Sequence, residues 1–123
     1  MIFAVEFDEV LARRVTKRVS PDFKASDWKL NPGPREALTS LRRYGQILIH
    51  THLISSDHPD CDAEETKNRL ALWLASHGYN WDYIWTGIGK PLADRYIEDA
   101  DQLFSCLEDF LKEEKQAIKE ITT

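Results

Sequence analysis

Acidic residues, a threonine and a lysine stand where short apolar segments of this sequence end. The residues concerned are Glu6, Asp8, Thr51, Lys90, Glu98 and Asp99. Carboxylate oxygens are ligands that Mg²⁺ accepts, and a lysine with a hydroxyl group can hold and neutralise phosphoryl oxygens during transfer. The set therefore predicts a magnesium-assisted phosphoryl-transfer site, provided that the fold brings these residues together.

Apolar runs and helical periodicity indicate the elements that would position these side chains. We expect strands at 1–5, 46–51, 83–85 and 96–97, and helices at 34–44, at 63–77 and from about 101 onward. Pro34 suits a first helical turn, and Gly45 follows the end of that helix. A helix between two apolar runs favours parallel strands, because a parallel connection needs a crossover.

The alternation of strands and helices predicts one α/β domain over residues 1–123, built on a parallel sheet. The mixed, polar stretch 10–32 is expected to form a flap or a minimal cap. Ligands of such sheets bind outside the carboxyl ends of the strands. We therefore expect Asp8, Thr51 and Lys90 to lie within the reach of one phosphate group.

Charge and composition exclude several other classes of function. The net charge is −5, and no stripe of lysine and arginine interleaves with aromatic residues, which argues against general nucleic-acid binding. The two cysteines, Cys61 and Cys106, show no paired spacing, and we find neither a signal peptide nor a membrane-spanning run. A cytoplasmic protein with free thiols, not associated with membranes, is expected.

The order of these motifs resembles the haloacid dehalogenase-like (HAD-like) superfamily. The first family motif is an apolar strand followed by Asp, any residue, Asp and commonly Gly, and the stretch 3–11 reads Phe-Ala-Val-Glu-Phe-Asp-Glu-Val-Leu. A strand ending in Thr matches 47–51, and a lysine followed by a late acidic pair matches 89–99. The resemblance implies a Rossmann-like three-layer sandwich with strand order 3-2-1-4 and without a large cap domain.

The same resemblance implies roles for individual residues. Glu6 occupies the position of the attacking carboxylate, and Asp8 that of the acid/base residue. Thr51 and Lys90 would grip the phosphoryl group, while Mg²⁺ would be held by Glu6, Asp8 and either Glu98 or Asp99, the last choice remaining open. The substrate would be a small phosphorylated metabolite or nucleotide.

Two positions depart from the family pattern. Glu6 is one methylene longer than the usual aspartate, and a displacement of ~1 Å in a reacting group can cost on the order of a hundredfold in rate. Glu9 stands where a glycine is common, which places a negative charge near the phosphate. The alternative is therefore a weakly active or inactive relative that binds a phosphorylated ligand or a protein partner.

Two further groups of residues have types that could form sites. His50, His52 and His58, with the acids and Cys61 of 57–62, could ligate a transition metal, but they lack a recognised zinc spacing, and a helix-entry loop explains their composition. The aromatic residues Trp73, Trp81, Tyr83 and Trp85 lie at helical and strand spacing. We interpret them as core.

Overall fold

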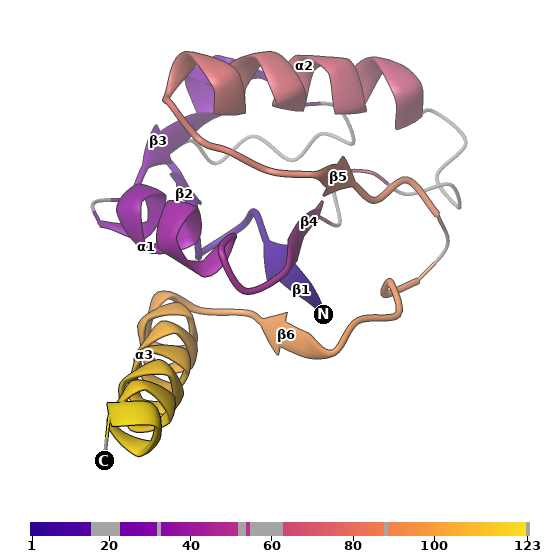
Figure 1. Cartoon of the computed structure of the whole chain (residues 1–123). Coiled ribbons are helices and arrows are strands. Elements are labelled where there is room, and N and C mark those ends of the chain that lie inside the picture. The colour runs from indigo at the N-terminus through magenta and orange to yellow at the C-terminus, as the bar shows by residue number, and fades with distance from the viewer. Residues whose placement is uncertain (16–22, 32, 52–53, 55–62, 88, 123) are drawn as a thin grey trace.

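A computed structural model describes residues 1–15, 23–31, 33–51, 54, 63–87 and 89–122. Within these residues the elements follow in the order β1 (Ile2–Glu6), β2 (Ala12–Arg14), a 3-10 helix η1 (Ala25–Asp27), β3 (Trp28–Leu30), α1 (Pro34–Leu41), β4 (Gln46–His50), α2 (Ala63–Ser76), β5 (Tyr83–Ile84), β6 (Arg95–Ile97) and α3 (Ala100–Thr122) (Figure 1). The predicted strands and helices are all present, with bounds shifted by a few residues.

Four strands form a parallel sheet in the order β5-β4-β1-β6. Counted along the chain among these four alone, the order is third, second, first, fourth. The central strand β1 pairs with β4 so that Glu6 lies opposite His50, and with β6 so that Val5 lies opposite Ile97. The strands therefore end at one edge of the sheet, and the α/β architecture with a parallel sheet is confirmed.

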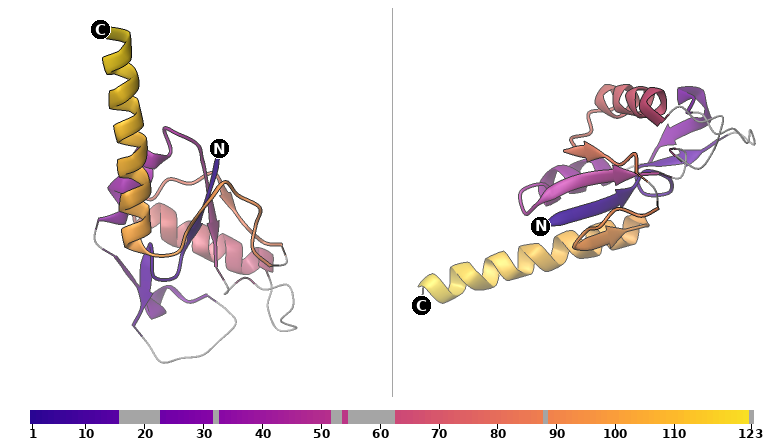
Figure 2. Two further views of the ribbon diagram at one scale, coloured as in Figure 1. Left: turned by 90° about the horizontal axis from the view of Figure 1, so that it is seen from below. Right: turned by 90° about the vertical axis from the view of Figure 1, so that its right-hand side faces the viewer.

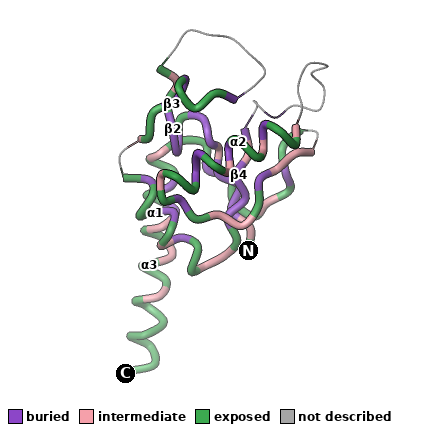
Figure 3. Tube along the Cα trace, turned by 90° about the horizontal axis from the view of Figure 1, so that it is seen from above, coloured by how far each residue is buried: buried purple, intermediate pink, exposed green. Residues whose placement is uncertain are grey.

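One face of the sheet carries the hydrophobic core. Phe3 and Val5 of β1 and their register partners Ile47 and Ile49 of β4 point into it. Residues of all three helices close the same core: Ala37, Leu38 and Leu41 of α1, Leu70, Trp73 and Leu74 of α2, and Leu103 and Cys106 of α3. Buried stretches, in purple, lie in the body of the domain, whereas the C-terminal end of α3 is green and exposed (Figure 3).

The opposite face of the sheet is formed by the residues that alternate with the core residues along each strand. Fewer side chains cover this face. Ala4 and Leu48 are buried there, whereas Tyr83 and Tyr96 are 53% and 41% exposed. The segment between β5 and β6 crosses this face, and the Tyr96 hydroxyl donates a hydrogen bond of 2.8 Å to the carbonyl oxygen of Pro91.

Among the described residues the helices pack on the core face, and the three-layer sandwich implied by the resemblance stays a prediction. The thin cover of the opposite face is explained by the length of the connection from β5 to β6. Residues 85–94 are fewer than the dozen or more that a helical crossover between parallel strands requires. A short irregular segment takes the place of a helix.

Helix α1 begins at Pro34 as its sequence predicts and ends at Leu41, three residues before the predicted end. Pro34 occupies the first turn, and Gly33, with φ of 95°, precedes it. Gly45 is required by close approach, since a Cβ atom there would lie 2.5 Å from the carbonyl oxygen of Met1. The turn between α1 and β4 can therefore lie directly against the start of β1.

Helix α3 packs on the core through its first half and continues past it (Figure 2). Phe110 contacts Phe3 edge-to-face at 5.5 Å and stacks on Tyr44 at 5.1 Å, whereas Ile118 and Ile121 are 56% and 84% exposed. None of the helices in the described part of the chain is long and apolar enough to cross a membrane.

The expected flap at 10–32 contains an antiparallel pair in its described part. Strand β2 pairs with β3, with Ala12 opposite Leu30. The ring centre of Trp28 in β3 lies 4.9 Å from that of Phe7, which directly follows β1. The two-stranded sheet therefore packs against the end of β1. Residues 16–22 and 32 lie outside the described residues.

Candidate functional site

The carboxyl ends of β1 and β4 bring Asp8 and Thr51 together. Both residues are buried, with 5% and 7% of their surface exposed, and the Thr51 hydroxyl donates a hydrogen bond to Oδ1 of Asp8. The two strand ends are joined by a backbone hydrogen bond of 2.9 Å from Phe7 N–H to the carbonyl oxygen of His50. The predicted proximity of Asp8 and Thr51 is confirmed, and that of Lys90, which pairs with Glu98, to these two residues stays a prediction.

A tight turn after β1 holds the Asp8 side chain in this position. The amides of Leu11 and Ala12 both donate to the carbonyl oxygen of Phe7, at 3.1 and 3.2 Å. The side-chain amide of Asn31 donates to the carbonyl oxygens of Glu9 and Val10, at 2.8 and 3.2 Å. Asn31, which follows β3, thereby anchors the turn that contains Asp8.

Glu9 adopts the left-handed backbone conformation within this turn, with φ of 74°. A side chain with a Cβ atom is strained there by about 1–2 kcal/mol, which a glycine avoids. The position where the resemblance expects a glycine is therefore one whose backbone favours glycine. The carboxylate of Glu9 is exposed beside the site.

Replacing Glu9 by glycine is expected to raise the free energy of unfolding by about 0.5–1 kcal/mol. Relief of the left-handed strain exceeds the extra chain entropy that glycine has in the unfolded state. Thermal unfolding should show a rise in Tm of about 2–5 °C. Glu113→Gly on the exposed side of α3 is the matched control and should lower stability by about 1 kcal/mol. A loss of stability in both variants would contradict the strain argument.

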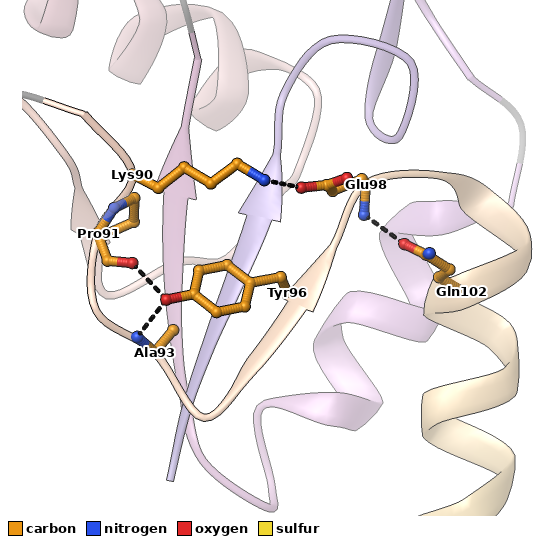
Figure 4. A network of polar contacts seen from close by, with 6 residues as sticks. All are labelled: Lys90, Pro91, Ala93, Tyr96, Glu98 and Gln102. Atoms are coloured by element: carbon orange, nitrogen blue, oxygen red, sulfur yellow. Dashed lines mark hydrogen bonds and ion pairs between the residues drawn. The ribbon is translucent and has the colours of Figure 1, made fainter.

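A second polar group lies on the thinly covered face of the sheet, at the same edge. Glu6 ends β1, His50 ends β4 opposite it, and Glu98 follows β6 one position beyond the Val5–Ile97 pair. Adjacent strands lie ≈ 4.8 Å apart, so these three side chains are neighbours in a row. Figure 4 shows Lys90 reaching across this face from the β5–β6 segment to Glu98.

Lys90 and Glu98 form a hydrogen-bonded ion pair. The bond to Glu98 is the main reason that the pKa of Lys90 is raised, and the charge of Glu6 adds to the effect. The same bond holds the pKa of Glu98 below its ordinary value. Both side chains are substantially exposed, 64% for Lys90 and 42% for Glu98, so solvent screens the pair.

His50 belongs to the same group, although its sequence context indicates only a possible zinc ligand. Burial lowers its pKa, and the charge of Lys90 lowers it further, while Glu98 and Asp8 oppose the shift. Its Nε2 atom is buried and has no hydrogen-bond partner among the described residues. Burial therefore favours the neutral form of the His50 imidazole, opposite Glu6 in the sheet.

The two late acids have different roles. Oδ1 of Asp99 accepts a hydrogen bond of 2.8 Å from the amide of Gln102, which caps the N-terminus of α3. The Gln102 side chain in turn accepts one of 2.7 Å from the amide of Glu98. Asp99 thus serves the helix, and Glu98 is the late acid that faces Glu6 and Lys90.

The carboxylates of the site suit a metal ion that also binds its substrate. Among the described residues, no three His, Cys, Asp or Glu side chains lie together as a protein-only metal site requires. Magnesium, however, is commonly held by one or two carboxylates plus the phosphate oxygens of a substrate. Glu6 and Glu98 are hard-oxygen donors at the ends of neighbouring strands and fit that kind of site, whereas Asp99, although its charge acts on Glu98, is engaged as the cap of α3.

Most of the possible zinc ligands lie outside the described residues. This holds for His52, for His58 and for the acids and Cys61 of 57–62. Tyr96, by contrast, is a described residue whose sequence context indicates only a strand, yet Nζ of Lys90 lies 5.7 Å from its ring centre. Its spacing of two residues from Glu98 is the signal that could have indicated a shared face.

Comparisons with protein-family models, curated proteins and solved structures found no match for this chain.

Proposed function

We propose that this chain is a HAD-like, magnesium-dependent phosphohydrolase of small phosphorylated metabolites or nucleotides, slowed by an atypical carboxylate at position 6. The observation that carries the proposal is the buried hydrogen bond between Thr51 and Asp8, which lies at the sheet edge where Glu6, Lys90 and Glu98 also converge. Ligands of parallel α/β sheets bind at this edge.

Each side chain has a part in this proposal that its position suits. Glu6 offers the attacking carboxylate from the end of the central strand. Asp8, oriented by the Thr51 hydroxyl, donates a proton to the leaving group and later accepts one from water. When the phosphoryl group is bound, the single Thr51 proton turns from Asp8 to a phosphoryl oxygen, and Lys90 supplies a cation from a different segment.

Magnesium, when bound by Glu6 and Glu98, would supply the positive charge that draws a phosphoryl group to an acidic site. The residues of the site carry more negative than positive charge, since Glu6, Asp8, Glu9 and Glu98 lie at or just beyond the ends of neighbouring strands and Lys90, paired with Glu98, is the cation described with them. An anionic substrate would be repelled by these carboxylates without an added cation. The short flap at 10–32 leaves the site open to substrates of various shapes.

A second candidate is a relative that binds a phosphorylated ligand without turnover. Glu9 favours this candidate, because it places an exposed negative charge in the turn beside Asp8, where the family commonly has a glycine. The longer Glu6 favours it too, because precise reach matters for attack and matters much less for metal binding. Binding is common to both candidates, and only turnover separates them.

Thermal unfolding with added ions tests the shared claim of ligand binding. Mg²⁺ with orthovanadate, a phosphate mimic, should raise the Tm, since a ligand at a hundred times its Kd stabilises the folded state by about 2.7 kcal/mol. Thr51→Val should lose most of this shift. The control is Thr39→Val on α1, whose hydroxyl bonds to the Arg35 carbonyl oxygen away from the site.

A comparison of Mg²⁺ with Zn²⁺ in the same unfolding experiment shows whether carboxylates or histidines bind the metal. Zn²⁺ in place of Mg²⁺ should give no comparable shift, because carboxylate oxygens suit the harder ion. A shift produced by zinc alone and abolished by His50→Ala would place the metal at the histidines instead. An unchanged Tm under every condition would contradict the proposed function.

A further inference from the structure

The Lys90 side chain lies where a cation for this site would be needed. It extends over the face of the sheet, its ammonium group bonds to Glu98, and Tyr96 lies beneath it (Figure 4). Glu6 ends the neighbouring strand, and Glu6 and Glu98 each follow directly after the paired residues Val5 and Ile97; the charge of Glu6 also acts on Lys90. The ammonium group therefore offsets the negative charge of two carboxylates on the thinly covered face.

The same two carboxylates are the donors that fit magnesium. A divalent cation at Glu98 would lie close to the Lys90 ammonium group, so the two positive charges would repel each other and compete for the carboxylate. The lysine is attached to an irregular segment and its side chain is 64% exposed, so it can leave Glu98 without disturbing the core. Its four-carbon stem with rotatable donors also allows it to turn to a nearby anion.

We propose that Lys90 is a displaceable internal cation, which occupies Glu98 in the resting protein and gives it up only when a phosphoryl anion and Mg²⁺ arrive together. The ammonium group stays protonated throughout and exchanges one anionic partner for another. This inference rests on the proposed function for its phosphoryl ligand. It predicts that the two ligands bind cooperatively, each raising the affinity of the other by the same factor.

Titration calorimetry of the whole chain tests this, with MgCl₂ alone, inorganic phosphate alone, and MgCl₂ in the presence of phosphate. In the unchanged protein, phosphate should tighten magnesium binding by about tenfold or more. In Lys90→Met, magnesium alone should bind about tenfold more tightly than in the unchanged protein, because one opposing charge at hydrogen-bond distance is removed. The effect of phosphate on magnesium affinity should largely disappear in this variant.

Two control variants separate displacement from a general effect of charge. Lys112→Met removes a lysine that also pairs with a glutamate, Glu108, but lies on α3, and it should behave as the unchanged protein does. Lys90→Arg retains the charge and should keep magnesium binding weak in the absence of phosphate. Circular dichroism checks that each variant is folded. If Lys90→Met does not fold, Lys90→Arg still allows the inference to be tested.

The outcomes separate this inference from the proposed function. Tighter magnesium binding in Lys90→Met with no phosphate binding in any protein would support the displaceable cation and contradict the proposed phosphoryl ligand. Equal magnesium affinity in the unchanged protein, Lys90→Met and Lys112→Met would overturn the inference, as would weaker magnesium binding in Lys90→Met or no magnesium binding in any of the three.

Discussion

A Glu6→Asp variant is expected to hydrolyse a generic phosphate ester about a hundredfold faster than the unchanged protein in the presence of magnesium. Glu6 pairs with His50 at the end of the central strand, and that strand is also paired with β6 up to Val5, so the strand cannot retreat to accommodate the longer side chain. The shorter carboxylate restores the reach at the one position where reach governs attack. Asp8 and Thr51 already lie together and need no change.

The assay distinguishes three chemical situations. Equal, measurable rates in both proteins would mean that Glu6 is not the attacking group and would favour direct attack by water. Absence of turnover in both would favour the non-catalytic candidate, and Glu6→Asp combined with Glu9→Gly would then remove the remaining obstacle to the substrate. Glu36→Asp, an equally conservative change in the first turn of α1, should leave the rate unaltered.

Much of the fold could be predicted because it depends on local pattern. The apolar runs at 1–5 and 46–51 and the helix signals at Pro34 and Gly45 are properties of neighbouring residues, and the structure has strands and a helix there. What covers a sheet face is not a local property. For the thinly covered face, the shortness of segment 85–94 was the available signal, because it cannot contain a crossover helix.

Some features of the candidate site could likewise be predicted from the sequence, and others could not. Thr51 and Asp8 could be expected to meet because parallel strands end at a common edge, and they do meet. The different roles of the late acids had a signal in the sequence, because Asp99 followed three residues later by Gln102 is typical of a helix N-terminus, and the backbone amide of residue 102 donates to the Asp99 carboxylate. The place of His50 beside Glu6 required the register of β1 against β4.

The largest effect on stability is expected at Phe7, which lies between the two acids of the first motif. Its ring is fully buried and packs edge-to-face against Phe23, Trp28 and Trp73, at 5.9, 4.9 and 5.3 Å between ring centres. These partners come from the flap and from α2. Phe7 therefore joins the end of the central strand to both elements that stand behind the site.

Phe7→Ala should lower the free energy of unfolding by about 3–5 kcal/mol, because it removes this contact area and leaves a cavity that the surrounding rings cannot fill. Urea unfolding followed by tryptophan fluorescence measures the loss. Phe104→Ala is the matched control, since that ring is 43% exposed on α3 and its removal should cost far less. Similar losses in the two variants would contradict the assigned role of the aromatic cluster.

Phe7→Leu separates the effect on stability from the effect on the site, since a smaller apolar side chain retains part of the packing and should keep the protein folded. The carbonyl oxygen of Phe7 accepts both amides that close the turn after Asp8. A shift of this residue therefore moves Asp8 relative to Thr51. We expect Phe7→Leu to weaken the stabilisation by Mg²⁺ and orthovanadate although no ligand-contacting side chain has changed, which would show that the core sets the geometry of the site.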